Sequence, residues 1–145
     1  MIITSPPDKW NKHWMNVALL TSKLSKDPST KVGAIIVTMD NRQCSLGYNG
    51  FAKGIDETEE DWNTRDIKLE MVIHAEENSL LNCPFETNGT KVYVTHKPCH
   101  KCLIRMLQAG IQEIYFLNDY TKMGNAEIWN KHAIKFKKIE KIDLP

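Results

Sequence analysis

The chain contains the run VGAIIVT at residues 32–38, which is apolar and rich in β-branched residues. Such a run, bounded by turn-forming residues, predicts a buried strand. Asp40-Asn41 marks a turn after it, and residues 43–48 form a second candidate strand. We therefore expect an antiparallel hairpin at the start of the sheet.

Helical and strand patterns alternate around this hairpin. Pro6-Pro7-Asp8 is typical of a helix start, and the helix that follows is expected to end at Lys26-Asp27-Pro28. Its apolar residues at helical spacing are Trp10, Trp14, Val17, Ala18 and Leu24. The later elements expected are a helix over 73–81, a strand over 91–95, a helix over 99–109 ended by Gly110, a strand over 113–117, a helix over 125–133 and a strand over 134–139. This order predicts an α/β fold with a mixed sheet, in a single domain over residues 1–145.

Residues 47–69 show no clear period and predict a long loop. The segment contains Gly50, Gly54 and an acidic cluster. The cluster consists of Asp56, Glu57, Glu59, Glu60 and Asp61. A loop of this length is usually functional or mobile, and we interpret its charges as a solvated surface.

Composition narrows the choice of partner. The 145 residues include 41% hydrophobic and 26% charged residues, with a formal net charge of +1. Proteins that bind nucleic-acid polymers usually carry a clear basic excess, so no such polymer is expected as a partner. Small anionic ligands remain compatible, because a few well-placed cations suffice for them.

The chain reads as a cytoplasmic protein. No apolar run approaches the ~20 residues that a membrane helix needs, and residues 1–12 lack the apolar region of a signal peptide. Disulfides are not expected in a reducing compartment. Cys44 and Cys83 are therefore interpreted as small buried hydrophobic residues.

Two short motifs combine into a predicted metal site. They are His74-Ala75-Glu76 and Pro98-Cys99-His100-Lys101-Cys102. One imidazole and two thiolates form a nitrogen–sulfur ligand set that suits Zn²⁺. Cys99 and Cys102 lie three apart, so both can face one side of a first helical turn. Three protein ligands leave one tetrahedral position open, as in catalytic zinc sites.

Glu76 is the predicted catalytic group. Both motifs fall at expected helix N-termini, where the helix dipole favours thiolates. On a regular helix, side chains at i and i+2 point about 200° apart. His74 and Glu76 therefore reach one metal only if the helix start is irregular or the metal lies off its end.

Two other interpretations of the cysteine motif remain open. Cys99 and Cys102 could form a thioredoxin-like redox pair, although this leaves His74 and Glu76 without a role. Alternatively, His96 or His100 could supply a fourth ligand and close a structural zinc site.

The sequence resembles the zinc-dependent cytidine and deoxycytidylate deaminase family, whose signature is H-x-E followed by P-C-x-x-C. The blocks SKDPSTKVGA (25–34), GYNGF (47–51), HAE (74–76), YVT (93–95) and PC (98–99) resemble the deoxycytidylate branch in particular. The resemblance implies a three-layer α/β/α fold with a five-stranded mixed sheet. It also implies a homo-oligomer, often a hexamer.

The resemblance further implies deamination of dCMP, with activation by dCTP and inhibition by dTTP. It places Asn49 on the substrate sugar and Tyr120 on the base. Ser29, Thr30 and Lys31 lie where phosphate contacts are expected. The allosteric motif corresponds to Gly47, Tyr48, Asn49 and Gly50.

The chain departs from the family pattern at two places. Ala52 stands where relatives commonly have proline. The segment between Gly54 and His74 also lacks the Cys and His ligands of a second, structural zinc. One Zn²⁺ per chain is therefore expected. The acidic cluster would require a divalent cation such as Mg²⁺ for a triphosphate to bind nearby.

In the expected reaction, Glu76 takes a proton from the attacking water, passes it to N3 of cytosine and later protonates the leaving amine. Three rival functions share parts of the signature. They are a tRNA adenosine deaminase, a free-cytidine deaminase and a zinc-stapled binding module without turnover.

Overall fold

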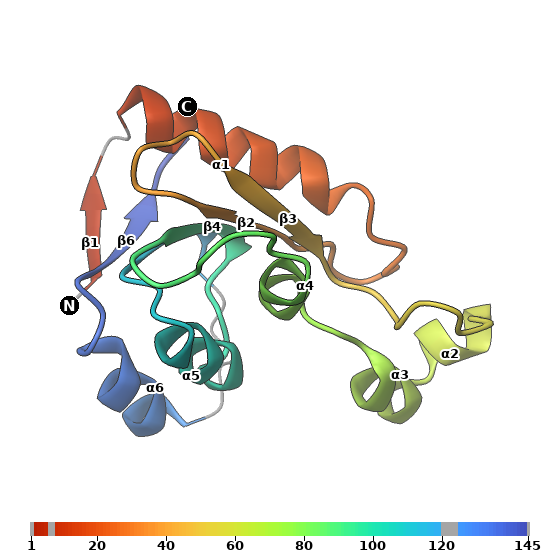
Figure 1. Ribbon diagram of the computed structural model, residues 1–145. Coiled ribbons are helices and arrows are strands. Elements are labelled where there is room, and N and C mark those ends of the chain that lie inside the picture. The colour runs from red at the N-terminus through yellow and green to blue at the C-terminus, as the bar shows by residue number, and fades with distance from the viewer. Residues whose placement is uncertain (1, 6–7, 120–124, 145) are drawn as a thin grey trace.

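The structure is a computed structural model that describes residues 2–5, 8–119 and 125–144. Its sheet has the strand order β1-β6-β5-β4-β2-β3 (Figure 1). The strands are β1 (Ile2–Ser5), β2 (Gly33–Val37), β3 (Cys44–Tyr48), β4 (Lys91–His96), β5 (Glu113–Asn118) and β6 (Lys138–Ile142). β2 pairs antiparallel with β3 and β4, whereas the pairs β4–β5, β5–β6 and β1–β6 are parallel. The expected five-stranded mixed sheet is present as β2–β6, and β1 adds a sixth strand that the sequence did not predict.

Helices cover both faces of the sheet. Helix α1 (Lys9–Ser22) lies on one face, and α4 (Ala75–Leu81), α5 (His100–Gln108) and α6 (Ala126–Ala133) lie on the other (Figure 1). Two short helices, α2 (Glu59–Asn63) and α3 (Arg65–Met71), extend to one side. This arrangement confirms the expected three layers. Among the described helices, none has the length and apolar character needed to cross a bilayer.

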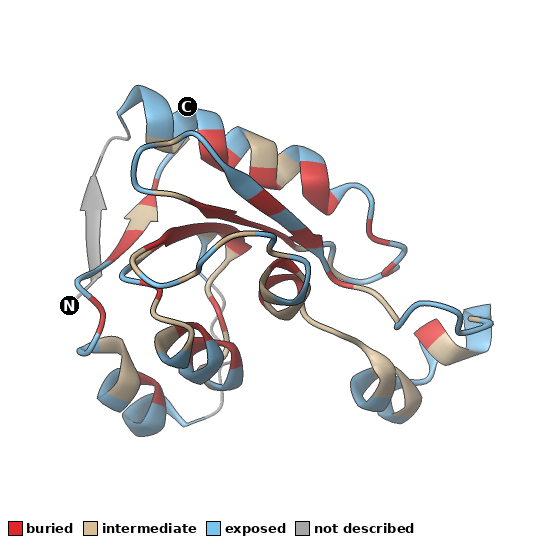
Figure 2. Ribbon diagram, viewed as in Figure 1, coloured by how far each residue is buried: buried red, intermediate tan, exposed pale blue. Residues whose placement is uncertain are grey.

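The apolar run in β2 explains why both faces are covered. All five of its residues are buried (Figure 2). Ala34 and Ile36 belong to the core under α4, α5 and α6, whereas Ile35 and Val37 belong to the core under α1. Because successive side chains of a strand point to opposite faces, a strand buried throughout needs a helical layer on each side.

Three predicted boundaries were wrong. Helix α1 ends at Ser22, and Leu24 beyond it is 60% exposed. The last strand begins at Lys138 because the backbone N–H groups of Lys135 and Phe136 still bond back to the end of α6. The expected loop over 47–69 contains α2 and part of α3.

A capping box accounts for the unpredicted helix α2. The Asp61 N–H donates to Thr58 Oγ1 (3.1 Å), and the Thr58 N–H donates to Asp61 Oδ2 (3.0 Å). Glu59, Glu60 and Asp61 fill its first turn. Acidic side chains stabilise a helix N-terminus, so part of the acidic cluster has a local structural role.

Helix α4 packs directly against the backbone of β3. Ser45 Oγ donates to the Ser79 carbonyl (2.8 Å), and Asn78 Nδ2 donates to the Tyr48 carbonyl (2.8 Å). A Cβ at Gly47 would lie 2.2 Å from the Ala75 carbonyl oxygen and 2.4 Å from the Ser79 nitrogen. Glycine at position 47 therefore permits the close approach that fixes α4 on the sheet.

We predict that Gly47→Ala destabilises the fold by about 1–3 kcal/mol, because the added methyl group forces backbone apart. Urea unfolding of the metal-free protein measures this. Gly50→Ala is the matched control, since the nearest atom to its Cβ would be 4.0 Å away. Equal losses in the two variants would contradict the packing role of Gly47.

Candidate active site

His74 is held at the point where α4 begins. The preceding residue, Ile73, pairs with Gly50 in an isolated antiparallel bridge, with N···O distances of 2.7 and 3.1 Å. His74 is the N-cap of α4, with an extended backbone at ψ 154°. Its N–H donates to Glu77 Oε1 at 3.1 Å. Because His74 lies just outside the helix, the angle of about 200° between side chains at positions i and i+2 of a helix does not apply to His74 and Glu76.

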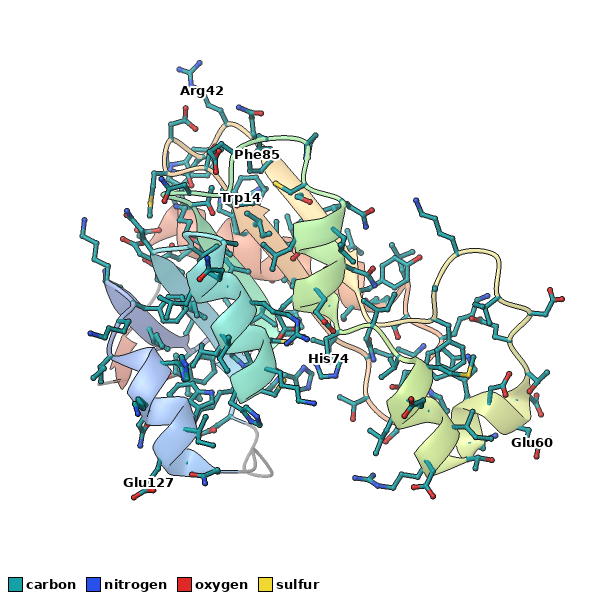
Figure 3. All side chains as sticks on the ribbon, turned by 60° about the horizontal axis from the view of Figure 1, so that its bottom comes forward. Trp14, Arg42, Glu60, His74, Phe85 and Glu127 are labelled. Atoms are coloured by element: carbon teal, nitrogen blue, oxygen red, sulfur yellow. The ribbon has the colours of Figure 1, made fainter. Side chains whose placement is uncertain are left out.

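Cys99 and Cys102 occupy the start of α5. Cys99 is the N-cap of that helix, and Cys102 lies buried in its first turn. Strand β4 leads into this helix and therefore brings both sulfurs to the end of the sheet where α4 also starts. The expected meeting of two helix N-termini is present. Figure 3 shows His74 in this position, between α5 and the α3 segment.

The three side chains form a compact donor set. His74 Nδ1 lies 3.6 Å from Cys99 Sγ and 3.3 Å from Cys102 Sγ. A tetrahedral zinc with usual Zn–N and Zn–S bonds separates these atoms by about 3.5 Å. The residues present therefore fit Zn²⁺. Over the described ranges, this is the full ligand cluster, and neither His96 nor His100 joins it.

The contacts within the donor set favour a thiolate at Cys99 and a protonated ring at His74 before a metal binds. A hydrogen bond with Cys102 and a further contact with His74 lower the pKa of Cys99 to about 3. The hydrogen bond with Cys99 raises the pKa of Cys102, and the hydrogen bond with Cys99 raises the pKa of His74 to about 9. A bound divalent cation attracts both sulfurs as thiolates and reverses the shift at Cys102.

Glu76 lies buried beside this donor set. It is 5% exposed and contributes to the same cavity as His74 and Cys99. Burial raises the pKa of its carboxyl group to about 7, and the nearby His74 partly opposes this shift. A carboxyl group with a pKa near neutrality can both accept and donate a proton under ordinary conditions.

The cavity has a volume of about 270 Å³. Its wall opposite the cysteines comes from the segment after α1, from the end of β3 and from α3. Asp27, Thr30, Asn49, Arg65, Lys68 and Leu69 are the main residues on that side. Polar and charged groups thus converge on a partly apolar hollow, which is typical of a small-molecule site.

Asp27 organises this wall. Its buried carboxylate accepts hydrogen bonds from the Ser29 and Thr30 N–H groups (2.8 and 3.2 Å) and pairs with Lys68 Nζ at 2.8 Å. Asn49 Nδ2 donates to Asp27 Oδ2 (3.1 Å) and to the Thr30 carbonyl (3.0 Å). One carboxylate therefore joins three segments that are distant in sequence.

The predicted substrate and effector residues are placed as follows. Asn49, Ser29 and Thr30 line the cavity, whereas Lys31 is exposed and is not among the described lining residues. Tyr120 lies outside the described residues.

Besides Asn49, the predicted effector motif contains Gly47, Tyr48 and Gly50. Gly47 packs against α4, and Gly50 pairs with Ile73. Tyr48 is 40% exposed.

Sequence reasoning missed several lining residues. They are Asp27, Arg65, Lys68, His96 and Lys97. A usable signal existed for two of them, because Arg65 and Lys68 lie three apart and so share a helix face. The aperiodic pattern of residues 47–69 predicts a loop, and a loop does not relate positions 65 and 68 in this way.

We predict that Cys99→Ala loses bound zinc, because two ligands in place of three cannot hold the metal tightly. Elemental analysis of purified protein checks this. Cys83→Ala serves as the control, since Cys83 Sγ contacts only the Phe85 carbonyl (3.4 Å) among the hydrogen-bond partners in the described residues. Full metal content in Cys99→Ala would refute the donor set.

Comparison with known proteins agrees with this geometry. Residues 8–118 match the family model for the cytidine and deoxycytidylate deaminase zinc-binding region. An uncharacterized deaminase from the luxG 3' region of Aliivibrio fischeri is 41% identical over 107 residues, covering 74% of this chain and 71% of that protein. Human deoxycytidylate deaminase is 37% identical over 117 residues, covering 77% of this chain and 66% of the human protein.

A solved structure shows the same fold. The dCMP deaminase of cyanophage S-TIM5, crystallised with dCMP and dUMP, superposes with a TM-score of 0.76 at 26% identity. The match covers 94% of this chain and 99% of the phage protein. The matched region includes both zinc-binding motifs and the Glu76 position. This chain therefore belongs to the cytidine and deoxycytidylate deaminase family, and His74, Cys99 and Cys102 form a candidate metal site within the region that the family model matches.

Proposed function

We propose that this chain catalyses the hydrolytic deamination of dCMP to dUMP with release of ammonia. The observation that carries the proposal is the buried Glu76 carboxyl group, which lines one cavity together with His74 and Cys99 of the three-residue donor set. The names of the human and phage relatives support dCMP as the substrate. The chain spans about two thirds of the human relative's length, and nearly all of the phage enzyme.

The residues divide the chemistry between them. When bound by its three ligands, zinc supplies a Lewis acid that lowers the pKa of water toward ~7. Glu76 accepts a proton from the attacking water and delivers it to N3 of cytosine, which makes C4 more electrophilic. After the water oxygen has bonded to C4, Glu76 takes the second proton from that oxygen and gives it to the amine, whose bond to C4 breaks as the C4=O bond forms. Water and dCMP enter, and dUMP and ammonia leave, so the carboxylate is restored in each turnover.

The phosphate of the nucleotide is best accommodated by Arg65. Besides His74 of the donor set, four basic side chains line the cavity, namely Arg65, Lys68, His96 and Lys97. Lys68 is already paired with the buried Asp27. Lys97 lies 4.4 Å from the Trp129 ring centroid and 3.9 Å from Asp119. Burial lowers the pKa of His96, so its ring is neutral near pH 7.

Arg65 remains as the cation without an ion-pair partner over the described ranges. A guanidinium group can bind a phosphate through two parallel hydrogen bonds. The sequence prediction assigns the phosphate contacts to Ser29, Thr30 and Lys31, whereas we propose Arg65 as the main contact. Ser29 and Thr30 remain candidates, because both line the same cavity.

We keep two substrate contacts as proposals. Tyr120 is proposed to stack on the base. Asn49 is proposed to contact the sugar, with its amide held in place by Asp27, Thr30 and the Val32 N–H, which donates to Asn49 Oδ1 at 2.9 Å.

Regulation and assembly are further proposals based on the family resemblance. They comprise activation by dCTP and inhibition by dTTP through residues 47–50, Mg²⁺ bound with the triphosphate, and a cytoplasmic homohexamer. The direct contacts of Asn49 with the cavity wall offer a physical route for such regulation. Movement of the 47–50 segment would displace Asp27 and the loop beside the substrate.

One assay panel tests the proposed reaction. Ammonia release is measured from dCMP, CMP, cytidine and dCTP, each with and without dCTP or dTTP as effector. We expect dCMP to have the highest kcat/KM. Glu76→Ala should retain zinc and lose nearly all turnover, because the three proposed ligands stay while the proposed proton carrier is removed. Equal turnover of cytidine and dCMP, or normal kcat in Glu76→Ala, would overturn the proposal.

Arg65→Gln tests the phosphate contact. A hydrogen-bonded charge pair is worth about 1.5–3 kcal/mol, so KM for dCMP should rise about 10- to 100-fold. Activity on cytidine, which has no phosphate, should not change. Arg42→Gln is the control, because Arg42 lies far from His74 (Figure 3). Equal losses on dCMP and cytidine would show that Arg65 supports the fold and does not bind phosphate.

A further inference from the structure

We propose that Glu77 and Arg105 form a latch that joins the two metal-binding helices and preorganises the zinc site. Neither side chain belongs to the ligand cluster. Both are therefore positioning residues, and their effect reaches the metal through the backbone of its ligands.

Three contacts build the latch. Glu77 Oε1 accepts a hydrogen bond from the His74 N–H at 3.1 Å. The other carboxylate oxygen, Oε2, pairs with Arg105 Nε at 3.1 Å. Arg105 Nη1 then donates to the Lys101 carbonyl at 3.0 Å. Because Lys101 lies between the two cysteines, the latch connects the backbone of the histidine ligand to the backbone of the thiolate ligands.

A metal bound by His74, Cys99 and Cys102 would also connect the starts of α4 and α5. A metal site forms more readily when its ligands are already held near their bound positions. Without the latch, α4 and α5 would still pack on the sheet and against each other, but their first turns would lose one of the connections that set their spacing. The latch should therefore increase zinc affinity.

The ion pair adds little to the stability of the fold itself. The Arg105 and Glu77 side chains are 50% and 28% exposed, and ion pairs in such positions are strongly screened by solvent. Zinc affinity and the stability of the metal-free protein should therefore respond differently. Loss of the latch should weaken metal binding while the unfolding of the metal-free protein changes little.

A simple charge effect predicts a different result at Arg105. If nearby charges only attract or repel the cation, removal of the Arg105 cation should strengthen zinc binding. The latch predicts weaker binding when either partner is removed. Arg105 therefore distinguishes positioning from electrostatic attraction.

The experiment measures zinc affinity by competition with a chromogenic chelator, in the full chain. Glu77→Gln and Arg105→Met should each weaken zinc binding about three- to tenfold, at the low end of the effect of groups that orient metal ligands. The double variant should be no weaker than the more affected single variant, because both changes break one connection. Co²⁺ spectra should keep their thiolate bands, since the ligands are unchanged. Lys141→Met is the control, as it breaks the Lys141–Asp143 pair (2.8 Å) away from the site.

Arg105→Lys keeps the charge and most of the packing. One ammonium group cannot reproduce the contacts of Nε with Glu77 and of Nη1 with the Lys101 carbonyl, so zinc binding should still weaken. Parental affinity in Arg105→Lys and Arg105→Met, tighter binding in Arg105→Met, or fully additive losses in the double variant would each overturn the latch. These outcomes concern metal binding and are independent of which nucleotide is deaminated.

Discussion

The site depends on one constraint, namely that two helices must begin at the same point. His74 and Cys99 are the N-caps of α4 and α5, and their side chains leave the helices at the ends where unpaired N–H groups and the positive dipole lie. Two thiolates and a proton-accepting carboxylate gain from that field. The ligand triad therefore follows from where the helices start, and the sheet determines those starting points through β4 and through the contact of α4 with β3.

The side of the cavity proposed to bind the substrate is held together by a different interaction. Here the backbone after α1, the end of β3 and α3 carry no shared regular structure, and a buried carboxylate, Asp27, holds them together. Buried charges are stable only when their hydrogen-bonding capacity is filled, and Asp27 meets this condition with two N–H groups, an amide and an ammonium group. Arg65 lines the same cavity and has no ion-pair partner among the described residues.

The parts of the fold that were predictable are those with a strong local signal. The buried run in β2, the helix ends beside His74 and Cys99 and the ligand set all follow from residue type and spacing. Strand β1 was missed because four residues before Pro6-Pro7 carry no periodic pattern of their own, and their pairing with β6 is a tertiary contact. Lys68 was missed for a related reason, since its role depends on Asp27, which lies 41 residues away. The capping box of Thr58 and Asp61 was a local signal that was overlooked.

The buried carboxyl group of Glu76 also imposes a cost on the fold. Burial raises the pKa of Glu76 from 4.5 to about 7, so the folded metal-free protein binds this proton more tightly than the unfolded chain does. Its contribution to stability therefore falls as pH rises from about 4.5 through 7, and above about pH 7 the fold carries the full cost of the buried ionised carboxylate. A divalent cation held by His74, Cys99 and Cys102 offsets that cost, because it places positive charge beside the carboxylate. Metal binding and the protonation state of Glu76 are thus coupled, because the cation and the carboxylate lie close together. The geometry of the ligands therefore affects the acid–base chemistry of Glu76 as well as the metal affinity.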